Sequence, residues 1–356
     1  MAVSLPARLS NLALLALIVA AGTYKVLVYS QEWNDIALWQ RNLFLSGDAG
    51  NPWQYRALSQ WIAIWLSSVD LRGWWEYDVM RTAQTALLLV LAYVHYGQLG
   101  FRPRTRFLGL VMIILLSMLS LRPSTYSLDR FTDAIIYLLA GIALFGGWSL
   151  LLIPLAFLGS LNRETAGFIP FMILAKEGSA LFSPAKRRQL AILIVALAAY
   201  TAAFFGIRAY YSFARITIQD TASRLASAFL FDVQRRGMWV AFFTAFNLLP
   251  FTSVVALPWC SAYLRRLFWI MVPAWIGIHF LTSWPREGLM FLPPIVSVLI
   301  PMTLHLVEGA AAWDRGPVRA RDFVLGARRH PPEHVAPDPA ERRAQPRPAR
   351  HLEPVA

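Results

Sequence analysis

The sequence predicts an all-α, polytopic transmembrane protein with about nine or ten spans. Of its 356 residues, 57% are hydrophobic and only 15% are charged, which is typical of chains that fold in lipid. Apolar runs close to the length of about 20 residues that a bilayer requires recur along the chain. The 14 tryptophans fit the aromatic belts that form at membrane surfaces.

The apolar runs predict the spans in order. They cover residues 10–30, 79–97, 106–121, 131–148, 149–161, 165–176, 189–207, 238–258, 267–284 and 289–307. The first run lacks a small-residue cleavage site, so we interpret it as a span and not as a removed signal peptide. The single cysteine, Cys260, excludes an internal disulfide.

The two short runs at 149–161 and 165–176 flank the polar motif Asn162-Arg163-Glu164-Thr165. A charge at membrane depth costs at least about 2.5 kcal/mol and usually faces a protein interior or a wet cavity. Each flanking half is too short to cross a bilayer alone. We therefore expect a short-helix hairpin or broken helix whose tip reaches a polar site, with Glu164 orienting Arg163.

Basic residues orient the spans. The loops at 102–106, 186–188 and 265–266, together with the C-terminal tail, all lie on the cytoplasmic side if the N-terminus is cytoplasmic and 149–176 is a hairpin. This agreement predicts a multi-pass protein of the inner (plasma) membrane with both termini in the cytoplasm. In this arrangement the arginines between residues 208 and 236 lie on the outer side of the membrane, where their charge favours the binding of an anion.

The chain divides into a predicted transmembrane core, residues 1–307, and a tail, residues 308–356. The tail is basic, rich in Pro and Arg and nearly free of aliphatic residues, which indicates disorder. It adds to the formal net charge of +13 and suits the anionic headgroups of the lipid bilayer. No nucleic-acid-binding module accompanies the charge, so we expect no nucleic-acid partner.

The first outer loop, residues 31–78, predicts two amphipathic helices in the membrane interface. Residues 55–69 place Leu58, Trp61 and Trp65 on one side at helical spacing, with Arg56 opposite. Residues 35–46 form a weaker second example, and a segment dense in turn formers joins the two. Such a shelf suits the headgroup of a lipid-linked substrate.

Acidic and basic side chains converge on the predicted outer face from four loops. The loops contribute Asp35, Asp48 and Arg56; Arg122, Asp129, Arg130 and Asp133; Arg163 and Glu164; and Arg286 and Glu287. Histidines stand alone, and no His/Cys cluster has metal-ligand spacing. A divalent cation bound by Asp35 and Asp48 is left open as a cofactor.

These motifs resemble those of the GT-C superfamily of membrane glycosyltransferases, which includes protein O-mannosyltransferases and lipid A aminoarabinose transferases. The resemblance covers roughly residues 10–307 and points to an uncharacterised bacterial branch. It rests on Asn34-Asp35, Gly47-Asp48, Pro52, Tyr55-Arg56, the motif at 162–165, Pro285-Arg286-Glu287 and Leu292-Pro293-Pro294. Many members carry Asp-Glu after the first span, whereas here Ile36 follows Asp35.

The resemblance implies an inverting hexosyltransferase that moves a sugar from a polyprenyl phosphate to a glycan, lipid or protein acceptor at the outer face. Asp35 or Asp48 would serve as the catalytic base. The substrate would be bound, and its leaving phosphate stabilised, by Arg56, Asp129, Arg163, Glu164, Arg286 and Glu287. A transporter or flippase of a lipid-linked sugar or small solute, and an O-antigen polymerase- or ligase-like protein, remain alternatives.

Overall fold

The prediction of an all-α fold is confirmed, since every regular element among the described residues is helical and none is a strand. The computed structural model describes residues 5–30, 41–42, 44–46, 55–69, 76–120, 128–211, 234, 236, 239–240, 243, 246–282 and 291–313. The chain divides into two units, Met1–Glu308 and Gly309–Ala356. The features below belong to the first unit, except that the last described helix continues to Trp313.

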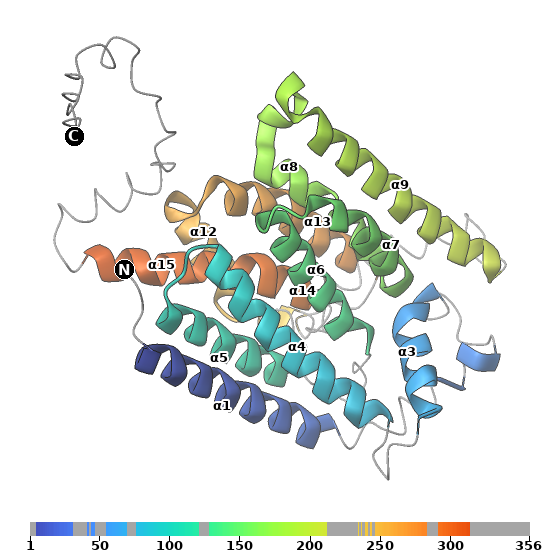
Figure 1. Cartoon of the computed structure of the whole chain (residues 1–356), viewed down its shortest axis with the longest axis horizontal. Coiled ribbons are helices and arrows are strands. Elements are labelled where there is room, and N and C mark those ends of the chain that lie inside the picture. Colours follow the sequence, from blue (N-terminus) through green and yellow to red (C-terminus); the bar gives the residue numbers. More distant parts are fainter. Residues whose placement is uncertain are drawn as a thin grey trace, which may run out of the picture. The chain divides into compact units, whose positions relative to one another are not determined.

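Long helices form the frame of this unit (Figure 1). They are α1 (Leu5–Ser30), α4 (Glu76–Gln98), α5 (Pro103–Ser120), α6 (Asp129–Phe145), α9 (Arg187–Tyr210), α13 (Ala262–Thr282) and α15 (Ile300–Trp313). Shorter helices are α3 (Ala57–Ser67), α7 (Leu152–Asn162), α8 (Phe171–Glu177), α12 (Leu249–Ala256) and α14 (Leu292–Pro294). Single turns complete it: η4 (Ser149–Leu151), η5 (Glu164–Phe168), η6 (Gly178–Phe182), η7 (Pro184–Lys186), η8 (Leu257–Trp259) and η10 (Ile295–Leu299).

Three helical stretches are long and apolar enough to cross a membrane, judged over the described residues. They are Leu9–Val28, Pro184–Tyr210 and Leu292–Gly309. Along the second stretch, Ile194 and Phe205 are more than half exposed, and an apolar helix surface of this kind suits lipid better than water. The structure therefore supports association with a membrane.

The segment from α7 to α8 runs along α6 and returns. Asn162, at the end of α7, donates its side-chain N–H to the carbonyl of Asp129 at the N-terminal end of α6 (2.7 Å). Lys176, near the end of α8, donates to the carbonyl of Leu144 at the opposite end of α6 (2.7 Å). The chain therefore reverses direction within residues 162–165.

The reversal depends on a tight turn with a close helix approach. Arg163 ends α7 in an extended conformation, with φ −154° and ψ 150°. The η5 turn then brings Ala166 against α7, where a Cβ added at Gly159 would lie 2.7 Å from the Cβ of Ala166. The hydroxyl of Tyr137 on α6 donates to the carbonyl of Thr165 and holds the turn in place.

Basic loops meet at the C-terminal end of α6, away from this turn. Three contacts place them there: Gln98 with the Ile142 carbonyl (3.3 Å), Lys186 with the Glu177 carboxylate (2.9 Å) and Arg266 with the Lys176 carbonyl (3.4 Å). α6 has 17 residues, so its two ends lie about 25 Å apart at a rise of roughly 1.5 Å per residue. The described basic loops therefore share one end of the unit.

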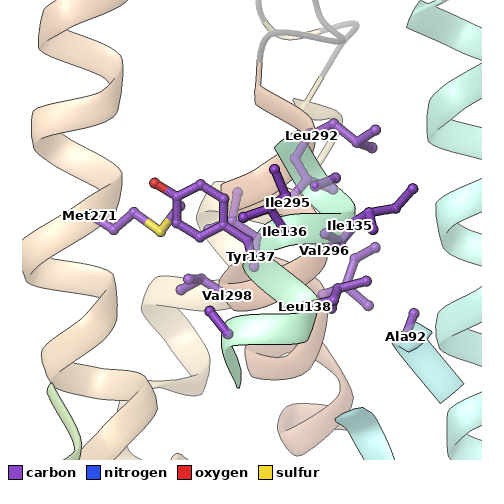
Figure 2. Packing of buried hydrophobic residues seen from close by; sticks show 14 of the residues in the cluster. Ala92, Ile135, Ile136, Tyr137, Leu138, Met271, Leu292, Ile295, Val296 and Val298 are labelled. Atoms are coloured by element: carbon purple, nitrogen blue, oxygen red, sulfur yellow. The ribbon is translucent and has the colours of Figure 1, made fainter. Parts of the chain in front are cut away.

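A buried apolar core separates the two ends. Figure 2 shows residues 135–138 of α6 among Met271 of α13 and Leu292, Ile295, Val296 and Val298 of α14 and η10. Rings extend this core, because Tyr137 meets Trp275 edge-on (centroids 5.7 Å apart) and Trp275 stacks on His279 (5.6 Å). The packing fixes α6 and so positions the acidic residues at its N-terminal end.

α3 packs its small residues against the protein. Ser59 and Ala63 are buried, whereas Trp61 and Trp65 are 42% and 65% exposed. A helix therefore forms where residues 55–69 predicted one, with its tryptophans outward. Of the second predicted interfacial helix, residues 41–42 and 44–46 are helical, and residues 35–40 lie outside the described part.

We expect Gly159→Ala to lower the free energy of unfolding by about 1–3 kcal/mol, because the new methyl group overlaps Ala166, which has no rotamer with which to move aside. Gly206→Ala on α9 is the matched control, since a Cβ there meets nothing within 4 Å. Thermal unfolding in detergent measures both. Equal stability of the two variants would contradict the close approach.

Candidate functional site

Among the described residues, six ionisable side chains meet beside the N-terminal end of α6, and we call them the polar cluster. They are Arg56, Asp129, Asp133, Arg163, Glu164 and Arg208. They come from the residue before α3, the first turns of α6, the turn after α7 and the last turn of α9. Three guanidinium groups and three carboxylates leave the cluster formally neutral.

α6 supplies the two most deeply buried carboxylates. Asp129 and Asp133 are four residues apart and so lie on one face of the helix. Their exposed fractions are 4% and 0%. Asp129 also sits in the first turn, where a negative charge complements the helix dipole. Thr165 donates its hydroxyl to Asp133 (3.1 Å), which joins the hairpin turn to α6.

Arg163 lies between these two carboxylates. Its Nε is 3.6 Å from Asp129 Oδ2 and 3.9 Å from Asp133 Oδ2, and its side chain is only 2% exposed. Its Nε and Nη1 make no hydrogen bond with any described residue. Buried donors of this kind are costly to leave unsatisfied. The guanidinium therefore has the capacity to bind one more acceptor, and oxyanions suit its geometry.

Glu164 pairs with two other arginines. Its carboxylate lies 3.5 Å from Arg56 Nη2 and 3.4 Å from Arg208 Nη2. The expectation that Glu164 orients Arg163 is therefore wrong. The physical reason is the extended backbone at Arg163, because neighbouring side chains on an extended segment point to opposite sides.

Burial raises the pKa of the Glu164 carboxyl, but its charged and hydrogen-bonding partners lower it by more. The guanidinium of Arg56, a hydrogen bond from its own backbone N–H, and the guanidinium groups of Arg163 and Arg208 together hold the pKa of its carboxyl below the usual value. Glu164 therefore remains ionised at neutral pH. Its side chain is 31% exposed, against 14% for Arg208 and 10% for Arg56, so the carboxylate marks the open side of the cluster.

Aromatic rings fix Arg208. Its guanidinium carbon lies 3.5 Å from the ring centroid of Phe204 and 4.6 Å from that of Tyr55. Cation–π contacts of this kind stabilise a charge at little conformational cost. Tyr200, one turn earlier than Phe204, donates its hydroxyl to the carbonyl of Glu164 (2.7 Å). The last turns of α9 therefore hold both the arginine and the backbone of its partner.

A frame of neutral polar groups surrounds the charges. Asn162 donates to the carbonyl of Asp129 and accepts a hydrogen bond from the Ser59 hydroxyl at 2.6 Å. Ser59 lies 3.1 Å from the hydroxyl of Thr132, to which Gln84 donates at 2.7 Å. The frame joins α3, α4, α6 and α7 and so holds in place the segments that carry the charged groups.

The structure brings together four of the site residues that the sequence predicted: Arg56, Asp129, Arg163 and Glu164. The others, Asp35, Asp48, Arg286 and Glu287, lie outside the described residues. No group of three or more His, Cys, Asp or Glu side chains that would hold a metal ion occurs in the described part of the chain. The cation considered for Asp35 and Asp48 also falls outside that part.

Two members of the polar cluster carried signals that sequence reasoning gave too little weight. Asp133 follows Asp129 by four residues, which places both on one helix face. Arg208 stands in the last turn of a long apolar helix, where an isolated charge is unusual. The neutral partners Ser59 and Thr132 had no distinguishing signal, since buried hydroxyls are common on helices.

No family model, no curated protein and no solved structure matches this chain. The likeness to GT-C glycosyltransferases therefore rests on the sequence motifs alone.

We expect Asn162→Ala to lower the free energy of unfolding by about 2 kcal/mol, because it removes two buried hydrogen bonds, one with the Ser59 hydroxyl and one with the Asp129 carbonyl. Ser59→Ala should cost less. In the double variant the two effects should overlap by about 1 kcal/mol, which chemical denaturation of all four proteins measures. Fully additive effects would show that the two side chains do not act together.

Proposed function

We propose that the protein is an integral membrane glycosyltransferase that moves a sugar from a polyprenyl-phosphate donor to an acceptor at the outer membrane face, with inversion. The observation that carries the proposal is the polar cluster, in which arginines and carboxylates from four segments converge at one end of a helical unit. Transfer from a lipid phosphate requires a cationic clamp for the leaving phosphate and a carboxylate base. The lipid chain of the donor accounts for the need for a membrane protein.

The proposal includes a multi-pass arrangement with both termini in the cytoplasm. Basic loops gather at the C-terminal end of α6, which suits the cytoplasmic side. The polar cluster lies at the other end, about 25 Å away along α6, a separation comparable to the hydrocarbon core of about 30 Å. The outward Trp61 and Trp65 of α3 then lie at the outer interface.

In the proposed reaction Arg163 stabilises the negative charge that grows on the leaving phosphate. Asp129 and Asp133 hold it in place, and a guanidinium forms paired hydrogen bonds to phosphate oxygens. Asp35 acts as the base that deprotonates the acceptor hydroxyl, with Asp48 as second choice. Arg286, from the last outer turn, is a further candidate for the phosphate.

The arrangement predicts that Trp61→Cys and Arg187→Cys, each in a Cys260→Ala background, react with a membrane-impermeant maleimide from opposite sides. Both positions are exposed, and they belong to opposite ends of the unit. Labelling of intact cells and of inverted membrane vesicles measures the sidedness. Reaction of both cysteines from one side would reject this arrangement.

Arg163→Lys should reduce sugar transfer at least about tenfold, because an ammonium keeps the charge but not the paired geometry of the guanidinium. The matched control is Arg266→Lys at the opposite end, where Arg266 donates to backbone carbonyls. The measurement is binding and turnover of a polyprenyl-phosphate sugar by purified protein. Equal turnover in the two variants would remove Arg163 from the proposed role.

A further inference from the structure

Glu164 differs from the other two carboxylates of the polar cluster in its exposure. It is the most exposed of the three carboxylates, and all three guanidinium groups lower the pKa of its carboxyl. Asp129 and Asp133, by contrast, are almost fully buried. Glu164 is therefore the carboxylate of the cluster that combines ion pairs to two arginines with partial exposure to solvent.

The arginines around Glu164 are held by other groups. Arg56 donates to Asp129 at 3.3 Å, and Arg208 lies against the rings of Phe204 and Tyr55. Departure of the Glu164 carboxylate would leave both guanidinium groups in place. Two fixed guanidinium groups facing one open position form a preorganised site for an oxyanion.

The Glu164 carboxylate is held by two ion pairs and by a hydrogen bond from its own backbone N–H. Its two ion pairs, at 3.4 Å and 3.5 Å, are longer than a well-formed charge-assisted hydrogen bond. Among the described residues no hydroxyl or amide side chain binds this carboxylate, whereas Thr165 binds Asp133. Rotation of the Glu164 side chain into solvent therefore breaks few contacts.

We propose that Glu164 is a resident anion: its carboxylate occupies the part of the phosphate site between Arg56 and Arg208 and leaves it when a lipid phosphate binds. Naming the ligand as a lipid phosphate rests on the proposed function, but the exchange of one anion for another does not. The exchange also conserves charge. An anion added to the neutral cluster would leave buried charge uncompensated unless one carboxylate moved out to water or took up a proton.

The expected result is opposite in sign to that of an ordinary ligand-binding residue. Glu164→Gln should bind farnesyl phosphate about five- to tenfold more tightly than the wild type, because the competing anion no longer occupies the site. Arg56→Gln and Arg208→Gln should each weaken binding at least about tenfold. Calorimetric titration of purified protein in detergent measures the dissociation constants, with farnesol as the uncharged control ligand.

Two further variants make the test decisive. Glu164→Asp keeps the charge but shortens its reach, so it should tighten binding by a smaller factor of about two to three, and it serves if the Gln variant is unstable. Glu177→Gln removes a carboxylate that pairs with Lys186 at the opposite end and should leave binding unchanged. Unchanged or weaker farnesyl phosphate binding in the Glu164 variants would overturn the inference.

The outcome is separable from that of the proposed function. Tighter farnesyl phosphate binding in Glu164→Gln without sugar transfer by the wild type would reject the glycosyltransferase and leave the resident anion standing. Sugar transfer with no effect of Glu164 on binding would do the reverse. A purely structural role for Glu164 predicts that stability and binding fall together in Glu164→Gln, which also rejects the resident anion.

Discussion

The ion pairs between Arg163 and the two aspartates of α6 are the constraint on which the site depends. They join the tip of a helical hairpin to the central helix, where all three side chains are almost entirely buried. Removing one partner from such a buried group typically costs about 3–5 kcal/mol, because the remaining charge stays in an apolar surrounding. The hairpin tip, the start of α3 and the end of α9 are therefore positioned relative to one charged centre.

This centre has a closed and an open side. On the buried side, Asn162 donates to the backbone carbonyl of Asp129 and Thr165 donates to the carboxylate of Asp133. On the more exposed side, Glu164 pairs with Arg56 and Arg208. The extended backbone at Arg163 produces this division, because it sends adjacent charged side chains in opposite directions. One residue in an extended conformation thus separates the ion pairs between Arg163 and the aspartates from those of Glu164.

Local patterns predicted several of the described helices, because an apolar run of sufficient length favours a helix. The runs at 79–97 and 189–207 lie within α4 and α9. The motif at 162–165 also indicated where the chain turns. The pairing of charges was beyond reach from sequence, since Arg208 meets Glu164 only through the packing of α7 against α9. Hence Arg163 and Glu164, neighbours in the chain, were wrongly paired.

The hairpin is attached to α6 at two distant points, by Asn162 at Asp129 and by Lys176 at Leu144. One inserted residue in α7 would turn every later side chain by about 100° and shift it by about 1.5 Å. Asn162 and Arg163 would then miss their partners together, and no adjustment at the far attachment would restore them. The number of residues between α6 and the hairpin tip is therefore as strictly constrained as their identity.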